Sequence, residues 1–400
     1  MVVIMIIRGH KLSLQNTVNK VFSSLGKIWE IVSGSAYSQA RKKLKAEVFI
    51  ELNEVAVEGY YEEYGKEKEV KLWKGHRLLG VDGTYLTLPD RKEIRKEFSI
   101  QRNQNKGKER VQAMASVLYD LRNDIAINAE IGKIQAEKKY IFDKHLGKTQ
   151  TQDIIVLDRA YADYAVMAMI IKKDRYFLIR IPSKSMKIVN KFWESEQTDE
   201  ILSLKITDTA KALVKEENIA IEIQVRFIKV ELENGEIEVL ATNLLDKENY
   251  KAEEFKQVYC WRWLQETYYD RIKNIFEIER FSGSSPLAIR QDFHGIIFLA
   301  TLESIVTKES QDILSSQTIE HNCQNPIKLN RATSYISLVD QVCELLLDKR
   351  FSTSETLAKL EFLFLSSTSC HPPARKSPRN KSRNFPAKLF FAKYVKRVIS

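Results

Sequence analysis

Hydrophobic residues near the N-terminus recur every three or four positions, which is the spacing of one face of an α-helix. The run lies between about Ser13 and Tyr64 and includes Val18, Val21, Phe22, Leu25, Ile28 and Ile31. Ser33-Gly34-Ser35 interrupts it, because glycine and small polar residues favour helix ends. We therefore predict a helix before the break and a second, basic helix after it, which carries Tyr37, Gln39, Arg41, Lys42 and Lys43.

From about His76 the pattern changes to short apolar runs that predict strands. Two of these strands flank Asp82-Gly83. The predicted elements are strands at Arg77–Val81, Tyr85–Leu88, Val111–Tyr119, Ile125–Ile131, Ile154–Leu157 and Tyr176–Ile181, and helices at Ile134–Leu146 and Tyr161–Lys173. Strands in a row followed by alternating helix and strand indicate an α/β sheet with mixed strand directions.

The stretch from about Ser183 to Leu245 contains runs in which apolar and polar residues alternate, such as Ile221 to Phe227. Asn234-Gly235 stands between two such runs and predicts a β-hairpin. We interpret this stretch as a β-rich insertion. Helix resumes near Lys247, and further helices are expected from Pro286 to about Leu365.

These patterns predict six segments along the chain. They are a helical N-terminal domain at 1–75, the first part of an α/β core at 76–182, the β-rich insertion at 183–246, a final core helix at 247–285, a helical C-terminal region at 286–370 and a basic tail at 371–400. The tail has nine Lys or Arg residues and no acid, so we expect it to be partly disordered when free and to attach to phosphates.

The charge balance favours a polyanionic partner, because 63 basic residues face 53 acidic ones and leave a net charge of +10. The basic helix with Arg41 fits either a surface along a DNA backbone or a solvated face of a helical bundle. The four cysteines have no CxxC spacing, which argues against zinc and disulfides and fits a reducing cytoplasm. The apolar run Met1–Ile7 is too short for a membrane span, so no membrane partner is expected.

The most informative motif is Tyr259-x2-Arg262-x3-Glu266-x6-Lys273. On one continuous helix, which turns by about 100° per residue, these four side chains lie within roughly 60° of one face. One carboxylate among phosphate-binding donors suits phosphodiester chemistry, because a metal prefers hard oxygen ligands and the phosphate prefers positive hydrogen-bond donors.

Two further acids, Asp82 and Asp158, each follow an apolar strand. Each acid also has a structural interpretation: Asp82-Gly83 is a favoured hairpin turn, Asp158 is placed to cap a helix, and Glu266 is placed to pair with Arg262 at i, i+4. Taken together they indicate a metal site, because close carboxylates repel one another unless a cation lies between them. Two Mg²⁺ ions about 4 Å apart, or Mn²⁺ in their place, serve hydrolysis of phosphodiesters.

Other polar and aromatic residues have weaker signals. Asp120, with Asp124 beside it, is either an auxiliary acid or, as we favour, a turn residue. The histidines, including His294, lack metal-ligand spacing and are expected to be structural. Trp263 is expected to pack in the core, and Trp193 is a candidate for stacking on a DNA base.

These motifs resemble the DDE transposases of the insertion-sequence-four family. The resemblance covers most of the chain and rests on Ser35 to Leu44, Val81-Asp82-Gly83-Thr84, Val156 to Tyr161, Tyr259 to Lys273 and Phe281-Ser282-Gly283. It implies an RNase H-like catalytic core, with Asp82, Asp158 and Glu266 as the metal-binding catalytic triad. It also implies that Tyr259, Arg262 and Lys273 contact phosphates near the cleaved DNA end.

The function that the resemblance implies is Mg²⁺-dependent cut-and-paste transposition of an insertion sequence through a DNA hairpin. The expected partners are the terminal inverted repeats, target DNA and a second copy of the chain, in a bacterial cytoplasm and on the nucleoid when bound to DNA. Two alternatives remain open at this point. They are a non-catalytic DNA-binding protein derived from a transposase and a related nuclease without strand transfer.

Overall fold

The computed structural model describes residues 14–27, 29–30, 32–66, 69–102, 109–134, 140–182, 187–207, 210–211, 218–232, 235–320, 325–347 and 352–370. Three features of the sequence analysis lie outside these residues: the apolar run Met1–Ile7, Asn234 of the expected hairpin and the basic tail. Among the described residues no helix is long and apolar enough to cross a membrane.

The chain forms two compact units that interleave in sequence. Residues 1–56, 87–112 and 270–400 belong to the first unit, and residues 57–86 and 113–269 belong to the second unit. Together they contain a large mixed sheet and many helices, so the mixed α/β class that the sequence predicts is confirmed at this level.

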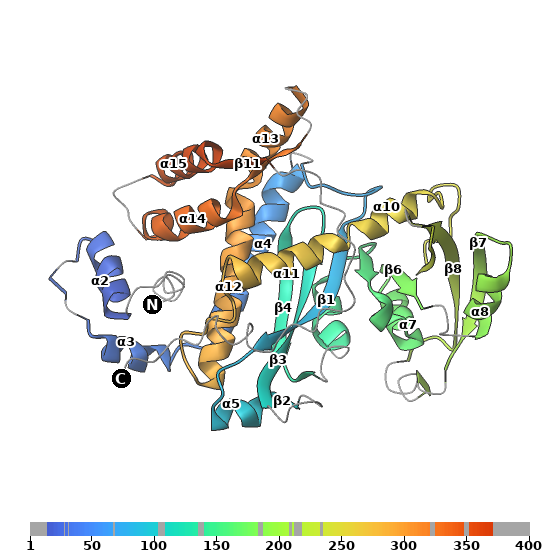
Figure 1. Cartoon of the computed structure of the whole chain (residues 1–400), viewed down its shortest axis with the longest axis horizontal. Helices are drawn as coiled ribbons and strands as arrows, with labels where there is room; N and C mark the ends of the chain where they lie inside the picture. The colour runs from blue at the N-terminus through green and yellow to red at the C-terminus, as the bar shows by residue number, and fades with distance from the viewer. Residues whose placement is uncertain are drawn as a thin grey trace. The chain divides into compact units, whose positions relative to one another are not determined.

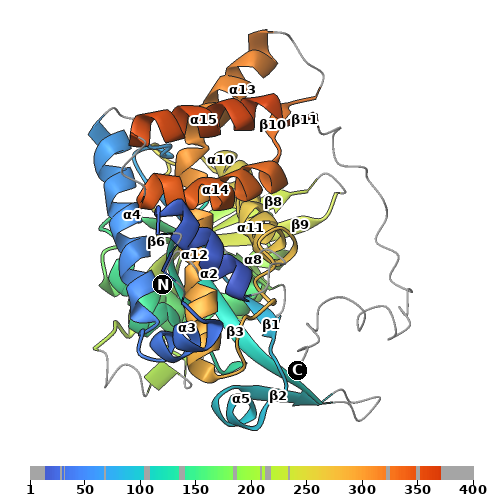
Figure 2. The same cartoon turned by 90° about the vertical axis from the view of Figure 1, so that its left-hand side faces the viewer.

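Helices dominate the first unit (Figure 1). They are α2 (Leu14–Ser24), α3 (Gly34–Arg41), the first half of α4 (Glu47–Lys66), α5 (Lys92–Glu97), the second half of α11 (Trp263–Asn274), α12 (Pro286–Val306), α13 (Lys308–Glu320), α14 (Arg331–Leu346) and α15 (Thr353–Ser366), with the short strands β2 (Ser99–Arg102), β10 (Ile327–Leu329) and β11 (Thr368–Cys370). Side chains fix several helix starts: Ser285 accepts from the Ala288 N–H at the start of α12, and Ser352 forms a capping box with Glu355 at the start of α15. Helices α14 and α15 lie side by side in both views (Figure 2).

The basic helix predicted after Ser33-Gly34-Ser35 exists as α3, and Ser33 caps it. Tyr37 and Arg41 are nevertheless buried, with 4% and 7% of their surfaces exposed. The Arg41 guanidinium lies 2.8 Å from Asp292 and donates to the Gln291 side chain within the same unit. Both interpretations of this helix, as a DNA surface or a solvated face, are therefore wrong for these two side chains, which are buried, and long-range pairing with Asp292 holds Arg41 inside.

The sheet occupies most of the second unit. Its strands are β1 (Leu78–Thr87), β3 (Glu109–Asp120), β4 (Ile125–Gly132), β5 (Ile154–Leu157), β6 (Tyr176–Ile181), β7 (Asp199–Lys205), β8 (Glu222–Glu231) and β9 (Ile237–Thr242), in the order β3-β1-β5-β6-β9-β8-β7, with β4 beside β3. Strands β1, β5 and β6 are parallel, and the other registered pairs are antiparallel. All four residues of β5 are buried, as expected of a parallel strand covered on both faces.

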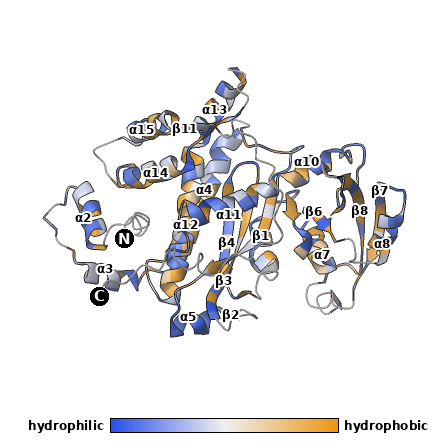
Figure 3. Ribbon diagram, viewed as in Figure 1, coloured by the Kyte–Doolittle hydropathy of each residue, from blue (hydrophilic) through white to orange (hydrophobic). Residues whose placement is uncertain are grey.

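Several helical segments of the second unit accompany this sheet. They are α7 (Tyr164–Lys172), α8 (Lys187–Glu194), α10 (Glu254–Cys260), the first half of α11, a π-helix at Ile141–His145 and 3₁₀ turns at Leu146–Lys148 and Arg159–Tyr161. Hydrophobic residues concentrate on the sheet strands and on α7 (Figure 3), which buries Tyr164 to Ile170. The core of this unit is thus the apolar contact between α7 and the sheet.

The β-rich insertion contributes β7, β8 and β9, which form an antiparallel set. Strand β9 also pairs with β6, so the insertion extends the main sheet. Gly235 turns the chain between β8 and β9 with a φ of +79°, which suits glycine. Helix α8 was not predicted, because its region was assigned to strands.

Two predicted elements are wrong in detail. The sequence predicts separate strands on either side of Asp82-Gly83, but β1 runs through both residues, so the hairpin interpretation of Asp82 is wrong. The sequence also predicts one helix through Tyr259 and Lys273, but α10 ends at Cys260 and α11 begins at Trp263. Periodicity did not reveal the break, because the local sequence contains neither glycine nor proline.

Gly80 marks the closest approach of α11 to the sheet. A Cβ atom at this position would overlap the Oε1 atom of Gln265 and come within 2.9 Å of Leu121 Cδ2. Gln265 is fully buried, and its amide donates to the Val117 carbonyl at 2.8 Å. Glycine on β1 therefore sets the depth at which Gln265, and the helix that carries it, sits on the sheet.

We expect Gly80→Ala to lower the free energy of unfolding by about 1–3 kcal/mol, because the added methyl overpacks this contact. Thermal or urea unfolding measures it. Gly59→Ala is the matched control, since Gly59 is exposed on α4 with nothing near its missing Cβ. The control should be neutral or stabilising by about 1 kcal/mol. Equal stability of the Gly80→Ala variant and the wild type would contradict the close approach.

His145 is buried between two polar side chains. The Asn128 amide donates to Nδ1 at 3.0 Å, which leaves the Nε2 hydrogen to donate to Ser116 Oγ at 3.0 Å. Burial lowers the pKa of His145 to about 3. The ring is therefore neutral in the folded protein, and the structural role expected of the histidines holds for this residue.

The folded protein should lose stability as the pH falls below about 6.5, because the unfolded chain then protonates His145 and the folded chain does not. At pH 5 the loss from this residue should be roughly 2 kcal/mol. Thermal unfolding between pH 7 and pH 5 measures it, and His145→Gln should show a shallower pH dependence. An unchanged slope in that variant would rule out this contribution.

Candidate active site

Asp82 and Asp158 lie next to each other on adjacent parallel strands. The register of β1 and β5 pairs Val81 with Leu157, and each acid follows directly. The backbone of Asp158 remains extended, with φ −81° and ψ 176°, so the two chains continue alongside each other. Adjacent strands are about 4.8 Å apart, so the two carboxylates originate from neighbouring points of the sheet.

Local hydrogen bonds orient both aspartates. The Oδ1 atom of Asp82 accepts from the Gly83 N–H at 2.8 Å, and the Oδ1 atom of Asp158 accepts from the Ala160 N–H at 2.8 Å. The capping interpretation of Asp158 is therefore confirmed, for the 3₁₀ turn at Arg159–Tyr161. A cap uses one carboxylate oxygen, so it does not conflict with a second role for the other oxygen.

Glu266 reaches this edge of the sheet from α11. Its Oε1 atom lies 2.9 Å from Arg262 Nη2, so the predicted i, i+4 pair is confirmed. The Arg262 Nη1 atom lies 3.9 Å from Asp82 Oδ2. One guanidinium therefore links the acid of the helix to the acid of β1.

Tyr259 lies one turn before Arg262 and is almost fully buried. Burial raises its pKa to about 12, the positive charges of Arg262 and Arg180 oppose this rise, and the negative charge of Asp158 adds to it. The phenol therefore keeps its proton at neutral pH and is a hydrogen-bond donor beside the acidic residues.

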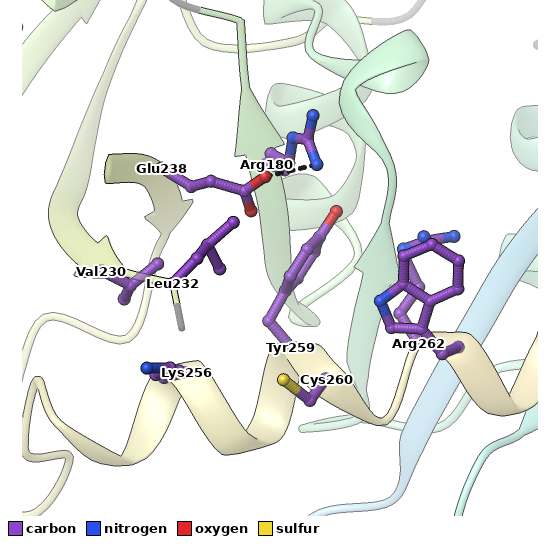
Figure 4. A pocket seen from close by; sticks show the side chains of 9 residues that line it. Arg180, Val230, Leu232, Glu238, Lys256, Tyr259, Cys260 and Arg262 are labelled. Carbon is purple, nitrogen blue, oxygen red and sulfur yellow. Dashed lines mark ion pairs between the residues drawn. The ribbon is translucent and has the colours of Figure 1, made fainter. Parts of the chain in front are cut away.

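A cavity of about 100 Å³ opens beside Tyr259 (Figure 4). Its polar lining includes Arg180, Glu238, Lys256 and Arg262, and Arg180 pairs with Glu238 at 2.6 Å. Three cationic side chains and one carboxylate leave this cavity positive, which suits a phosphate group.

Several of these cavity residues had only weak signals in the sequence. Arg180 is a charged residue inside the apolar strand β6, and this break in the pattern was its one signal. Trp263 was expected in the core, but 48% of its surface is exposed and it lines the cavity. The prediction of a core position for Trp263 is therefore wrong.

The remaining candidates have the following surroundings. Lys273 is half-buried on the second half of α11, which belongs to the first unit, and burial lowers its pKa against the effect of Glu279. Asp120 is fully buried, and its carboxylate accepts from Tyr61 and the Arg122 N–H, which confirms a turn residue. The indole N–H of Trp193 is buried with no hydrogen-bond partner among the described residues.

The donor set of Asp82, Asp158 and Glu266 fits Mg²⁺ chemically, since all its ligating atoms are hard carboxylate oxygens. In the part of the chain that the structure describes, however, no three or more acidic, histidine or cysteine side chains come together closely enough to hold a metal. In the described residues the Arg262 guanidinium lies against two of these acids, 2.9 Å from Glu266 and 3.9 Å from Asp82.

Comparison with known proteins shows the family to which the chain belongs. A family model described as "Transposase DDE domain" matches residues 73–302, which is more than half of the chain. The chain belongs to this family of transposases, and membership supports a DNA transposase. No curated protein matches.

One solved structure is similar in outline. It is the cryo-EM structure of a piggyBac transposase synaptic complex with hairpin DNA, with a TM-score of 0.40 and 9% sequence identity over 96% of this chain and 77% of that chain. A likeness this distant carries no argument about the present chain.

The Tyr269 hydroxyl donates to the main-chain oxygen of Asp82 at 2.6 Å and ties α11 to the strand that carries this acid. We expect Tyr269→Phe to lower the free energy of unfolding by about 1 kcal/mol, because the carbonyl loses its partner while the ring is retained. Chemical unfolding measures the loss. A variant as stable as the wild type would show that this bond does not hold the strand.

Proposed function

We propose that this protein is a Mg²⁺-dependent DNA transposase of an insertion sequence, of the insertion-sequence-four type, with an RNase H-like catalytic core. It binds the terminal inverted repeats of its own element, cuts the DNA there and joins the ends to target DNA through a hairpin intermediate. It acts as a dimer on DNA. The Transposase DDE domain match over residues 73–302 supports the class of enzyme.

The observation that carries this proposal is the adjacency of Asp82 and Asp158 at the end of the β1–β5 pairing, with Glu266 linked to Asp82 through Arg262. Acids that come from three separate stretches of sequence reach one edge of the sheet. Each acid has a local partner, but a helix cap or one ion pair does not require acids from three stretches of sequence to share the same guanidinium and strand edge.

Asp82, Asp158 and Glu266 would hold the divalent cations. Bound there, Mg²⁺ lowers the pKa of an attacking water or 3′-hydroxyl and stabilises the leaving oxygen. The chain itself positions the DNA: Arg262 is suited to bidentate contact with a phosphate, and Tyr259 donates its phenolic hydrogen. Lys273 is proposed to supply a further positive charge to the backbone.

Substitution of the acids tests the catalytic part. We expect Asp82→Asn, Asp158→Asn and Glu266→Gln each to reduce cleavage of a terminal-repeat duplex by at least about a hundredfold, because each amide is a poorer ligand and cannot balance the charge of the metal. The repeat sequence comes from the DNA that flanks the gene. Gel assays in Mg²⁺ measure cleavage, hairpin formation and joining, and fluorescence anisotropy measures binding.

Asp163→Asn is the matched control. Asp163 follows Asp158 closely and caps α7 by accepting from the Ala165 N–H, and asparagine caps equally well. This variant should cleave like the wild type. Cleavage without joining by the wild type would indicate a nuclease, binding without any cleavage would indicate a non-catalytic protein, and normal cleavage by one of the three acid variants would remove that residue from the triad.

A further inference from the structure

The Arg262 guanidinium spans two acids that the proposed function assigns to metal binding. Its Nη2 atom lies 2.9 Å from Glu266 and its Nη1 atom lies 3.9 Å from Asp82. Glu266 is half exposed, whereas Arg262 has only 8% of its surface exposed. A cation therefore already lies against these carboxylates in the protein alone.

In this position the Arg262 guanidinium does not form all the hydrogen bonds that it could donate. The Arg262 Nε atom is buried and has no hydrogen-bond partner among the described residues. The contact with Asp82 is beyond hydrogen-bond length, so only one of the two carboxylate contacts is a good hydrogen bond. A buried donor without an acceptor costs free energy, which leaves Arg262 ready to exchange its partners.

The cavity beside Tyr259 offers the guanidinium another position. Arg262 lines this cavity together with Lys256 and with Arg180, whose charge Glu238 balances. The Arg262 side chain therefore borders two environments: the carboxylate of Glu266 and a cavity whose charge suits a phosphate group.

We propose that Arg262 is a placeholder cation: it neutralises Asp82 and Glu266 in the protein alone and must release them before they hold a divalent cation. This inference rests on the proposed function, because it takes these acids as the metal ligands. The same carboxylate oxygens cannot serve both cations at full strength, so the Arg262–Glu266 pair and metal binding oppose each other. The opposition is reciprocal, as linkage requires.

Metal binding to the full-length protein without DNA tests this proposal. Calorimetric titration with Mn²⁺ alone should show Arg262→Gln binding about fivefold tighter than the wild type, or more, because the competing cation is gone. Lys256→Gln is the matched control, since it removes one positive charge from the same cavity and leaves the ion pair in place. It should change the affinity by less than about twofold, as screened surface charges do.

A second measurement follows tryptophan fluorescence in the wild-type protein, in which the Arg262–Glu266 ion pair is intact. The Arg262 guanidinium lies 5.0 Å from the centre of the Trp263 ring, so its departure should alter the emission of this tryptophan. Addition of Mg²⁺ to the wild type should change the fluorescence, and Trp263→Phe should abolish that change. This arm requires no substitution at Arg262 and stands even if Arg262→Gln fails to fold.

The outcomes separate the two proposals. Two results would overturn the proposal that Arg262 is a placeholder cation and leave the proposed transposase function standing. One is equal Mn²⁺ affinity of the wild type and Arg262→Gln, and the other is a Lys256→Gln variant that gains as much affinity as Arg262→Gln. No change of Trp263 emission at saturating Mg²⁺ would do the same. A wild-type protein that neither binds Mn²⁺ nor cuts the terminal-repeat duplex with Mg²⁺ present would overturn the proposed function itself.

Discussion

The parallel pairing of β1 with β5 is the constraint on which the candidate site depends. Because Val81 lies opposite Leu157, the next residue on each strand is an aspartate, and the two acids leave the sheet side by side. A shift of one residue in this register would separate the two acids. The observed register of β1 with β5 therefore fixes the position of the acids along with the fold.

The third acid depends on how closely α11 approaches the same strand. The absence of a side chain at Gly80 admits Gln265, which donates to the carbonyl of Val117, and Tyr269 donates to the carbonyl of Asp82. These contacts surround Glu266 on the helix. The geometry that would hold a metal thus rests on ordinary packing and hydrogen bonds a few residues from the acids, and Arg262 fills the space between them.

Much of the fold could be predicted from local pattern. The strands at Ile154–Leu157 and Tyr176–Ile181 were predicted with their observed ends, because a short apolar run with polar boundaries has few other solutions. Pattern was a poorer guide where no residue in the local sequence indicates that the secondary structure continues or ends. Strand β1 continues through Asp82-Gly83 because its neighbours in the sheet hold it extended, although the same dipeptide favours a turn in isolation.

The sequence by itself determined the mixed α/β class and offered Asp82, Asp158 and Glu266 as candidate acids, since both depend on residue types and local spacings. Tertiary structure alone decided which charged and aromatic side chains are inside. It buried Arg41 against Asp292, exposed Trp263 beside a cavity, brought Arg180 to Glu238 and placed Arg262 between Asp82 and Glu266. The contacts of Arg41 with Asp292, of Arg180 with Glu238 and of Arg262 with Asp82 join residues far apart in the chain. No periodicity records such a contact, because its free energy exists only after the chain has folded.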